Sequence, residues 1–174
     1  MKKIIFLISV CVLSTSSAQV LIGENQIDEG QSTILYFNNS SSNTNGIILP
    51  AVENISNALA QSSVSNNGTF LFDKSDKKVK MYEKNLWVTL SGNGNTSQII
   101  NNNSDELGKG IIIGDETSGA KGILVLESSD KAMILPKVFN PNINVKSPYP
   151  GMICYDTYSK SLAVFDGNFW SYWK

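Results

Sequence analysis

Short apolar runs separated by turn-forming residues fill most of this chain, and that pattern predicts strands. Near the C-terminus we expect strands at Met152 to Tyr155, at Leu162 to Phe165 and at Asn168 to Trp173. Asp156 to Ser159 forms the first expected turn. Asp166-Gly167 between alternating apolar residues indicates a type I′ hairpin, since both central positions of that turn need positive φ. The pattern therefore predicts a three-stranded antiparallel meander.

An earlier stretch repeats this order, with strands expected at Thr69 to Phe72, Lys78 to Tyr82 and Leu86 to Leu90. Lysines alternate with apolar residues in the middle strand, which indicates one solvated face. The wider lysine run has interleaved acidic residues and is also interpreted as a solvated strand face; it consists of Lys74, Lys77, Lys78, Lys80 and Lys84. Glu83-Lys84 replaces Asp-Gly here, so a different or longer turn is expected.

The two stretches belong to an internal duplication. Gly46 to Val52 matches Ala132 to Val138 at an offset of 86 residues. Further identities and similarities follow at an offset of 83: Gly68, Asp73, Lys77, Val79, Tyr82, Asn85 and Trp87 correspond to Gly151, Asp156, Lys160, Leu162, Phe165, Asn168 and Trp170. Upstream, Leu21 to Glu24 resembles Ile112 to Asp115, and Ile34 to Phe37 resembles Ile123 to Leu126.

This duplication predicts an all-β fold of two tandem β-meander modules with little helix. Module 1 covers residues 19–92 and module 2 covers residues 111–174. Residues 93–110, rich in Asn, Ser and Gly, are expected to form a flexible linker. The Leu-Pro pairs at 49–50 and 135–136 indicate an edge strand or an extended arm in each module rather than a helix. Ile55 to Gln61 suits one short helix, whereas Pro141 is expected to prevent a helix in the matching stretch of module 2.

Residues 1–18 have the features of a signal peptide. Lys2 and Lys3 precede an apolar run that is too short to span a bilayer, and Ser16-Ser17-Ala18 predicts cleavage before Gln19. A lipoprotein reading through Cys11 is disfavoured because β-branched Val10 precedes it. The exported chain then keeps only Cys154, within an apolar strand. We expect this thiol to be buried, although a lone exported thiol could also pair between chains.

The amino-acid composition excludes several kinds of catalytic and binding group. The chain has 174 residues, a formal net charge of −1, no His, and only lysine among its basic residues. The absence of His excludes imidazole bases and imidazole metal ligands, and the absence of Arg excludes bidentate guanidinium binding of phosphate or carboxylate. The net charge of −1 provides no electrostatic attraction for nucleic acid. The acidic pairs are Asp105-Glu106 and Asp115-Glu116. Neighbours on a strand point to opposite faces, so the two carboxylates of a pair are not expected to meet in one catalytic site. We predict no catalytic residue, no cofactor and no metal.

Aromatic residues are the best candidates for binding. Trp87 and Trp170 recur at matching positions, which favours a structural role in each module's core. Trp173 has only Leu90 as its counterpart and is the better candidate for a contact surface. Aromatic faces beside Asp and Asn can stack on sugar rings and bond their hydroxyls. The predicted ligand-binding residues are Trp173, Tyr172, Trp170, Asp166 and Asn168.

The second module also resembles a repeat of secreted surface proteins from gliding and gut Gram-negative bacteria, and segments of phage tail fibres. The resemblance rests on Leu135 to Val138, Ser147-Pro148, Gly151 to Asp156 and Phe165 to Trp170, with Ser128 to Lys131 as the lead-in. It covers most of module 2 and, more loosely, module 1. It implies a secreted, surface-associated, non-enzymatic module and a trimeric fibre-like element, without naming a partner.

Two hypotheses follow. The first is a secreted, non-enzymatic cell-surface structural or adhesive protein that presents β modules to an envelope or extracellular protein or glycan. It includes homo-oligomerisation through exposed strand edges. The alternative is a soluble carbohydrate-binding module that uses the C-terminal aromatic residues. Nucleic acid is not an expected partner in either case.

Overall fold

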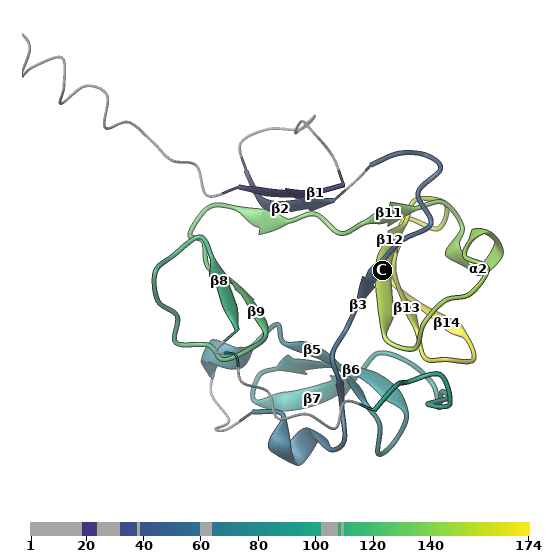
Figure 1. The fold of residues 1–174 in the computed structure, drawn as a ribbon, viewed down its shortest axis with the longest axis horizontal. Helices are drawn as coiled ribbons and strands as arrows, with labels where there is room; N and C mark the ends of the chain where they lie inside the picture. The colour runs from purple at the N-terminus through teal and green to yellow at the C-terminus, as the bar shows by residue number, and fades with distance from the viewer. Residues whose placement is uncertain (1–18, 24–31, 38, 60–63, 102–107, 109) are drawn as a thin grey trace, which may run out of the picture.

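The all-β prediction is confirmed. The structure is a computed structural model that describes residues 19–23, 32–37, 39–59, 64–101, 108 and 110–174. The predicted signal peptide lies outside these residues. Among these residues, strands in four sheets make up nearly all the regular structure, with one turn of α-helix and two short 3₁₀ turns. Figure 1 shows how these elements are arranged. No helix among the described residues has the length and apolar character needed to cross a membrane.

The first meander forms a sheet of four strands in the order β4-β5-β6-β7. The strands are β4 (Ala51–Val52), β5 (Phe70–Asp73), β6 (Lys78–Glu83) and β7 (Leu86–Thr89). The last three strands are antiparallel, as predicted, and β4 lies parallel to β5 along its outer edge. The Leu-Pro arm therefore continues into the sheet as an edge strand.

The second meander has the same order, β11-β12-β13-β14. Its strands are β11 (Lys137–Val138), β12 (Met152–Asp156), β13 (Ser161–Phe165) and β14 (Trp170–Trp173). The registers also match: Phe72 pairs with Val79 as Tyr155 pairs with Leu162, and Tyr82 pairs with Trp87 as Phe165 pairs with Trp170. An offset of 83 residues relates these pairs, the same offset that relates the two sequences.

Upstream of each meander lies a parallel pair of strands. β1 (Val20–Ile22) pairs with β2 (Thr33–Phe37), and β8 (Ile111–Ile113) pairs with β9 (Leu124–Leu126). Leu21 faces Tyr36 in the first pair and Ile112 faces Val125 in the second, so the residues matched by sequence occupy matched places. The two modules therefore share one strand order within the described residues.

The arms of the modules cross over. β3 (Ile47–Ile48), from module 1, pairs antiparallel with β12 of module 2. Its counterpart β10 (Ala132–Met133), from module 2, pairs parallel with β2 of module 1. Figure 1 shows both crossings: the light-green strand beside β2 is β10, and β3 runs to β12. We call β3 and β10 the exchanged arms.

One apolar core joins the two meanders. Phe72, Val79 and Leu90 from module 1 pack with Ile153 and Val164 from module 2, and each is at most 4% exposed. Burying an apolar side chain of this size stabilises a fold by about 1.5–3 kcal/mol. The two sheets consequently stabilise each other and form a single packed body.

The lengths of the two hairpin turns are the opposite of those predicted. The two-residue turn lies in module 1, where Glu83 pairs with Leu86 and the central residues Lys84 and Asn85 have φ of 50° and 64°. In module 2, Phe165 pairs with Trp170, so the turn from Asp166 to Phe169 has four residues and is not a type I′ hairpin. The Asp166 carboxylate accepts the backbone N–H groups of Asn168 and Phe169, each at 2.8 Å, and this side chain sets the turn instead.

The helix prediction is also corrected. In the part of the chain that the structure describes, the α-helical turn lies in module 2, as α2 (Pro141–Asn144), because Pro141 occupies the first turn, where a missing N–H costs nothing. Module 1 has only the 3₁₀ turns η1 (Ile55–Asn57) and η2 (Val64–Asn66). The predicted helix from Ile55 to Gln61 extends beyond the described residues, and within them only η1 forms.

Lys80 is not solvated as predicted. Its ammonium lies 2.8 Å from Asp73 Oδ2 and 2.6 Å from Asp76 Oδ2, and its side chain is only 9% exposed. Burial lowers the pKa of Lys80, but hydrogen bonds to Asp73 and Asp76 outweigh burial and raise the pKa overall. Lys74 also departs from the prediction, since its side chain is 14% exposed and pairs with Glu53. Lys84, at 86% side-chain exposure, is solvated, but it lies in the β6–β7 turn rather than on a strand face.

Candidate binding site

A hollow of about 390 Å³ opens beside β14 in module 2. Four short segments of module 2 form its walls: the α2 turn, the β12–β13 turn, the end of the β13–β14 loop and β14 itself. We call it the aromatic hollow. Its lining residues are Asn140, Asn142, Asp156, Tyr158, Ser159, Phe169, Trp170 and Tyr172.

The hollow is rich in exposed aromatic rings. Phe169 is 73% exposed, Tyr158 67% and Tyr172 42%. Trp170 differs, since its ring packs 5.3 Å from that of Phe165 across the hairpin. The matching pair in module 1, Tyr82 and Trp87, has ring centroids 5.1 Å apart. Trp170 thus has a structural partner, whereas the other three rings present large surfaces to solvent.

Two amide side chains complement the rings. Asn140 adopts the left-handed conformation with φ 45°, and its backbone N–H donates to Asp156 Oδ1 at 2.9 Å. Asn142, in α2, is exposed to solvent. Within the part of the chain that the structure describes, neither the Asn140 nor the Asn142 side-chain amide has a hydrogen-bond partner. Both amides are therefore available to a ligand.

Asp156, the one charged residue in the lining, already has hydrogen-bond donors within the protein. Asp156 is 2% exposed and accepts hydrogen bonds from four donors, the backbone N–H groups of Asn140, Tyr158 and Ser159 and the Ser159 hydroxyl. Burial raises the pKa of Asp156, but these hydrogen bonds outweigh burial and lower the pKa overall. Asp156 is thus an ionised structural group that shapes the β12–β13 turn.

Charge also affects Tyr172 and Cys154, which lie near Asp156. Burial is the largest cause that raises the pKa of Tyr172, and the charges of Asp156 and Cys154 add to it. Burial and Asp156 together raise the pKa of Cys154 to about 12. Cys154 is a free, buried thiol, as expected. Both groups are consequently neutral at pH 7, and neither provides a nucleophile.

The predicted site residues do not all converge. Trp170 and Tyr172 line the aromatic hollow. Trp173 points to the opposite face of β14, since successive strand residues alternate, and its indole N–H donates to the Leu90 carbonyl at 2.6 Å. Asp166 is 1% exposed and holds the β13–β14 turn. The Asn168 amide contacts the Asn93 carbonyl at 3.4 Å.

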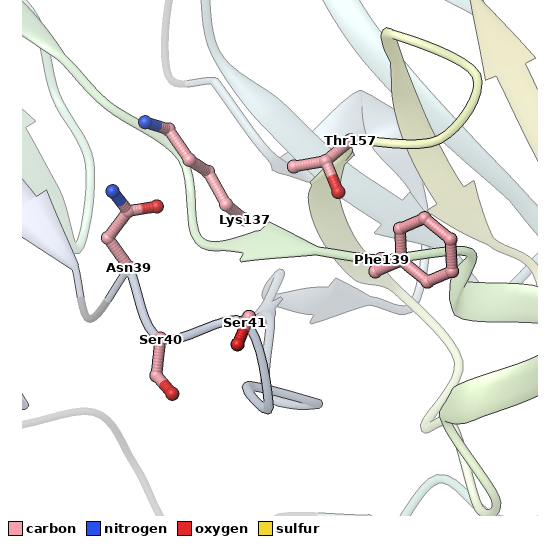
Figure 2. A pocket seen from close by; sticks show the side chains of 6 residues that line it. All are labelled: Asn39, Ser40, Ser41, Lys137, Phe139 and Thr157. Atoms are coloured by element: carbon pink, nitrogen blue, oxygen red, sulfur yellow. The ribbon is translucent and has the colours of Figure 1, made fainter.

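A second hollow, of about 440 Å³, lies between the loop after β2 and β11. Figure 2 shows its lining: Asn39, Ser40, Ser41, Lys137, Phe139 and Thr157. Phe139 is its only aromatic residue, and that ring makes an edge contact with Tyr158 of the aromatic hollow, with centroids 5.6 Å apart. With one ring and a cationic wall, this hollow is less suited to stacking than the aromatic hollow.

The lining residues outside the predicted ligand-binding set are Asn140, Asn142, Asp156, Tyr158, Ser159 and Phe169. They come from the α2 turn and from two hairpin turns, whose geometry was predicted differently. A signal did exist, since aromatic Tyr158 and Phe169 replace Ser75 and Leu86 of module 1. Among the described residues, no three Cys, Asp or Glu side chains are grouped as metal ligands.

Comparison with protein-family models, with curated proteins and with solved structures found no match to this chain.

Proposed function

We propose that this chain is a secreted, non-enzymatic cell-surface protein that presents β modules to an envelope or extracellular partner. The observation that carries the proposal is the exposed aromatic rim of module 2, formed by Tyr158, Phe169 and Tyr172. The rim stands on a sheet whose core is shared with module 1. A rigid scaffold with exposed rings on short turns suits recognition, because little ordering is needed when a partner binds.

Module 1 supports the proposal as an internal reference. Its sheet has the same order and register as that of module 2, but Ser75, Leu86 and Thr89 occupy the places of the three exposed rings. The strand order and register common to both modules are therefore assigned to folding. The exposed rings found only in module 2 are suited to contact with a partner.

Self-association through the β8–β9 pair is part of the proposal. Ile34 and Leu35 in β2 are at most 2% exposed, and β10 pairs with that strand. Their counterparts Ile123 and Leu124 are 58% and 48% exposed, and β9 pairs only with β8 among the described strands. An apolar strand edge of this kind favours pairing with another chain. The trimer implied by the family resemblance is the expected assembly.

The test of location uses the full chain expressed with a C-terminal tag in its native host. We expect the mature protein to start at Gln19 and to be digested by protease added to intact cells. Pull-down from intact envelope, followed by mass spectrometry, should then recover an envelope or extracellular partner. A chain that keeps Met1 and resists external protease would overturn the proposal.

The test of assembly is light scattering of the mature chain. We expect a trimer that dissociates when Leu124→Lys places a charge on the β9 edge. Thr89→Lys, on the exposed end of β7, is the control and should leave the trimer intact. A monomer at all concentrations would overturn the assembly but not the location.

The alternative function, a soluble carbohydrate-binding module, is favoured by the amides and rings of the aromatic hollow. Release of the mature chain into the medium without attachment to cells would favour this alternative.

A further inference from the structure

We infer that the aromatic hollow is a binding site for a neutral saccharide. The inference rests on the proposed function, since it names the ligand class that the exposed rim of module 2 recognises. It moves the expected site away from Trp173, Asp166 and Asn168 to a set of residues on the opposite side of β14.

The first step is the comparison of the two modules. Trp87 and Trp170 each pack against the aromatic residue opposite on the neighbouring strand, so this pair is a requirement of the fold. Tyr158 makes an edge contact with Phe139. None of the three exposed rings is required by the sheet itself, because module 1 builds the same sheet with Ser75, Leu86 and Thr89. Exposing large rings without structural need is costly, so a binding role accounts for them better than packing.

The second step is charge. No lysine lines the hollow, and its single carboxylate, Asp156, already accepts four hydrogen bonds from the protein. A cationic ligand would find no free anion, and an anionic ligand would find no cation. The lining is therefore electrostatically suited to an uncharged ligand.

The third step is hydrogen bonding. The Asn140 and Asn142 side chains each offer a carbonyl acceptor and an N–H₂ donor, which together match neighbouring hydroxyls that both donate and accept. The backbone of a proline-rich peptide, the other neutral ligand that aromatic grooves bind, mainly offers carbonyl acceptors. The unused amide carbonyls therefore favour a sugar over such a peptide.

The fourth step is the shape of the site. Asn140 is held in the left-handed conformation by α2 and by its N–H bond to Asp156. Such conformations cost energy and are concentrated at binding sites. The volume of about 390 Å³ lies in the range of small-ligand pockets, which is roughly 300–1,000 Å³. The backbone that carries the Asn140 amide is thus held in place by α2 and by Asp156.

The test is a printed array of neutral mono- and oligosaccharides, probed with the mature chain and followed by fluorescence titration with the best sugar. Replacing the rings by their module 1 counterparts gives the key variant, Tyr158→Ser/Phe169→Leu/Tyr172→Thr. We expect this variant to lose binding by roughly tenfold or more while keeping its urea midpoint. Asn142→Ala should also weaken binding, because it removes a hydrogen-bonding amide and no packing.

The matched controls are Leu86→Ala and Thr89→Ala, which truncate the equivalent positions in module 1 and should leave sugar binding unchanged. Binding that survives the triple variant with an unchanged midpoint would overturn the inference. So would an array with no bound sugar, or selective binding to a proline-rich peptide library. In each of those cases the proposed function still stands if the protein remains on the cell surface and recovers a partner by pull-down.

Discussion

The indole N–H of Trp173 donates to the backbone carbonyl of Leu90, which is the residue that Trp173 itself corresponds to in the first module. Leu90 is buried in the shared core, while Trp173 is 44% exposed. The last strand of the chain is thereby hydrogen-bonded to the segment that follows the last strand of module 1. This contact assigns Trp173 to the junction between modules rather than to the aromatic hollow.

Replacing Trp173 by Phe tests that junction. The variant keeps an aromatic ring but leaves the Leu90 carbonyl without its donor, so we expect the free energy of unfolding to fall by about 1 kcal/mol. Urea unfolding measures the change. Tyr172→Phe, on the other face of β14, serves as the control. Equal stability of wild type and Trp173→Phe would show that this hydrogen bond does not hold the modules together.

Lys80→Ala should be strongly destabilising. It leaves Asp73, which is 1% exposed, without its cationic partner, and breaking a buried ion pair costs about 3–5 kcal/mol. Module 2 has Ala163 and Ser159 where module 1 has Lys80 and Asp76, and Ser159 Oγ donates to Asp156. The double variant Lys80→Ala/Asp76→Ser should therefore recover part of the loss.

Thermal unfolding of the single and double variants measures this recovery. Lys84→Ala is the control, since its side chain is 86% exposed and such surface pairs contribute about 0–1 kcal/mol. A double variant no more stable than Lys80→Ala would show that the two turns are not interchangeable.

Two nearby glycines, Gly92 at the end of module 1 and Gly94 in the predicted linker, give a steric test. A Cβ at Gly94 would lie 1.8 Å from the Asp166 carbonyl oxygen, whereas a Cβ at Gly92 would lie 3.7 Å from Asp166 Oδ2. Gly94→Ala should lower the free energy of unfolding by about 1–3 kcal/mol because the two backbones must separate. Gly92→Ala should have little effect. Equal effects would place the linker away from the β13–β14 turn.

Acid should destabilise the fold through Asp73 and Asp156. Burial raises the pKa of each, but hydrogen bonds from the groups around it lower the pKa below the ordinary value of 3.8. Their stabilisation is therefore present above pH 3.8 and is lost as the pH falls through the lowered values. Urea unfolding at a series of acidic pH values should show this loss, and Asp156→Asn should reduce its slope. If Asp156→Asn leaves the slope of stability against pH unchanged, other carboxyl groups cause the loss of stability in acid.

Cys154 should resist thiol reagents in the native protein. It is buried, and its pKa of about 12 leaves almost no thiolate at pH 7. We expect no reaction with a coloured disulfide reagent until denaturant is added, and no disulfide-linked dimer under oxidising conditions. Rapid labelling of the folded chain would contradict the buried position.

The strands could be predicted because alternation and turn formers are local signals, as in Met152 to Asp156 and Lys78 to Glu83. The turns could not, because their conformations depend on contacts with distant residues. Gly94 and Asn95 pack on Asp166 and Gly167, which accounts for a four-residue loop in place of a tight hairpin. Lys80 follows the alternation of a surface strand, yet Asp73 and Asp76 hold it inside.

The candidate site was predicted only in part for the same reason. Trp170 and Tyr172 were identified from their chemistry and their place on one strand. Asn140 and Asn142 were not, since Pro141 was read as a helix breaker rather than as the first residue of α2. The sequence cannot show which aromatic residue already has a partner: Trp173 donates a hydrogen bond to Leu90 on one face of β14, whereas Tyr172 lines the aromatic hollow on the other face.

The exchanged arms affect how the chain comes to be folded. The sheet of module 1 has Phe72 and Val79 in a core that is completed by Ile153 and Val164, and β2, which also belongs to module 1, takes β10 of module 2 as a partner. During synthesis, the first half of the chain therefore emerges with an apolar face uncovered and cannot reach its native packing until the last strands are made. We expect the nascent polypeptide to remain unfolded until synthesis is nearly complete, the condition in which a chain can be threaded through a membrane pore.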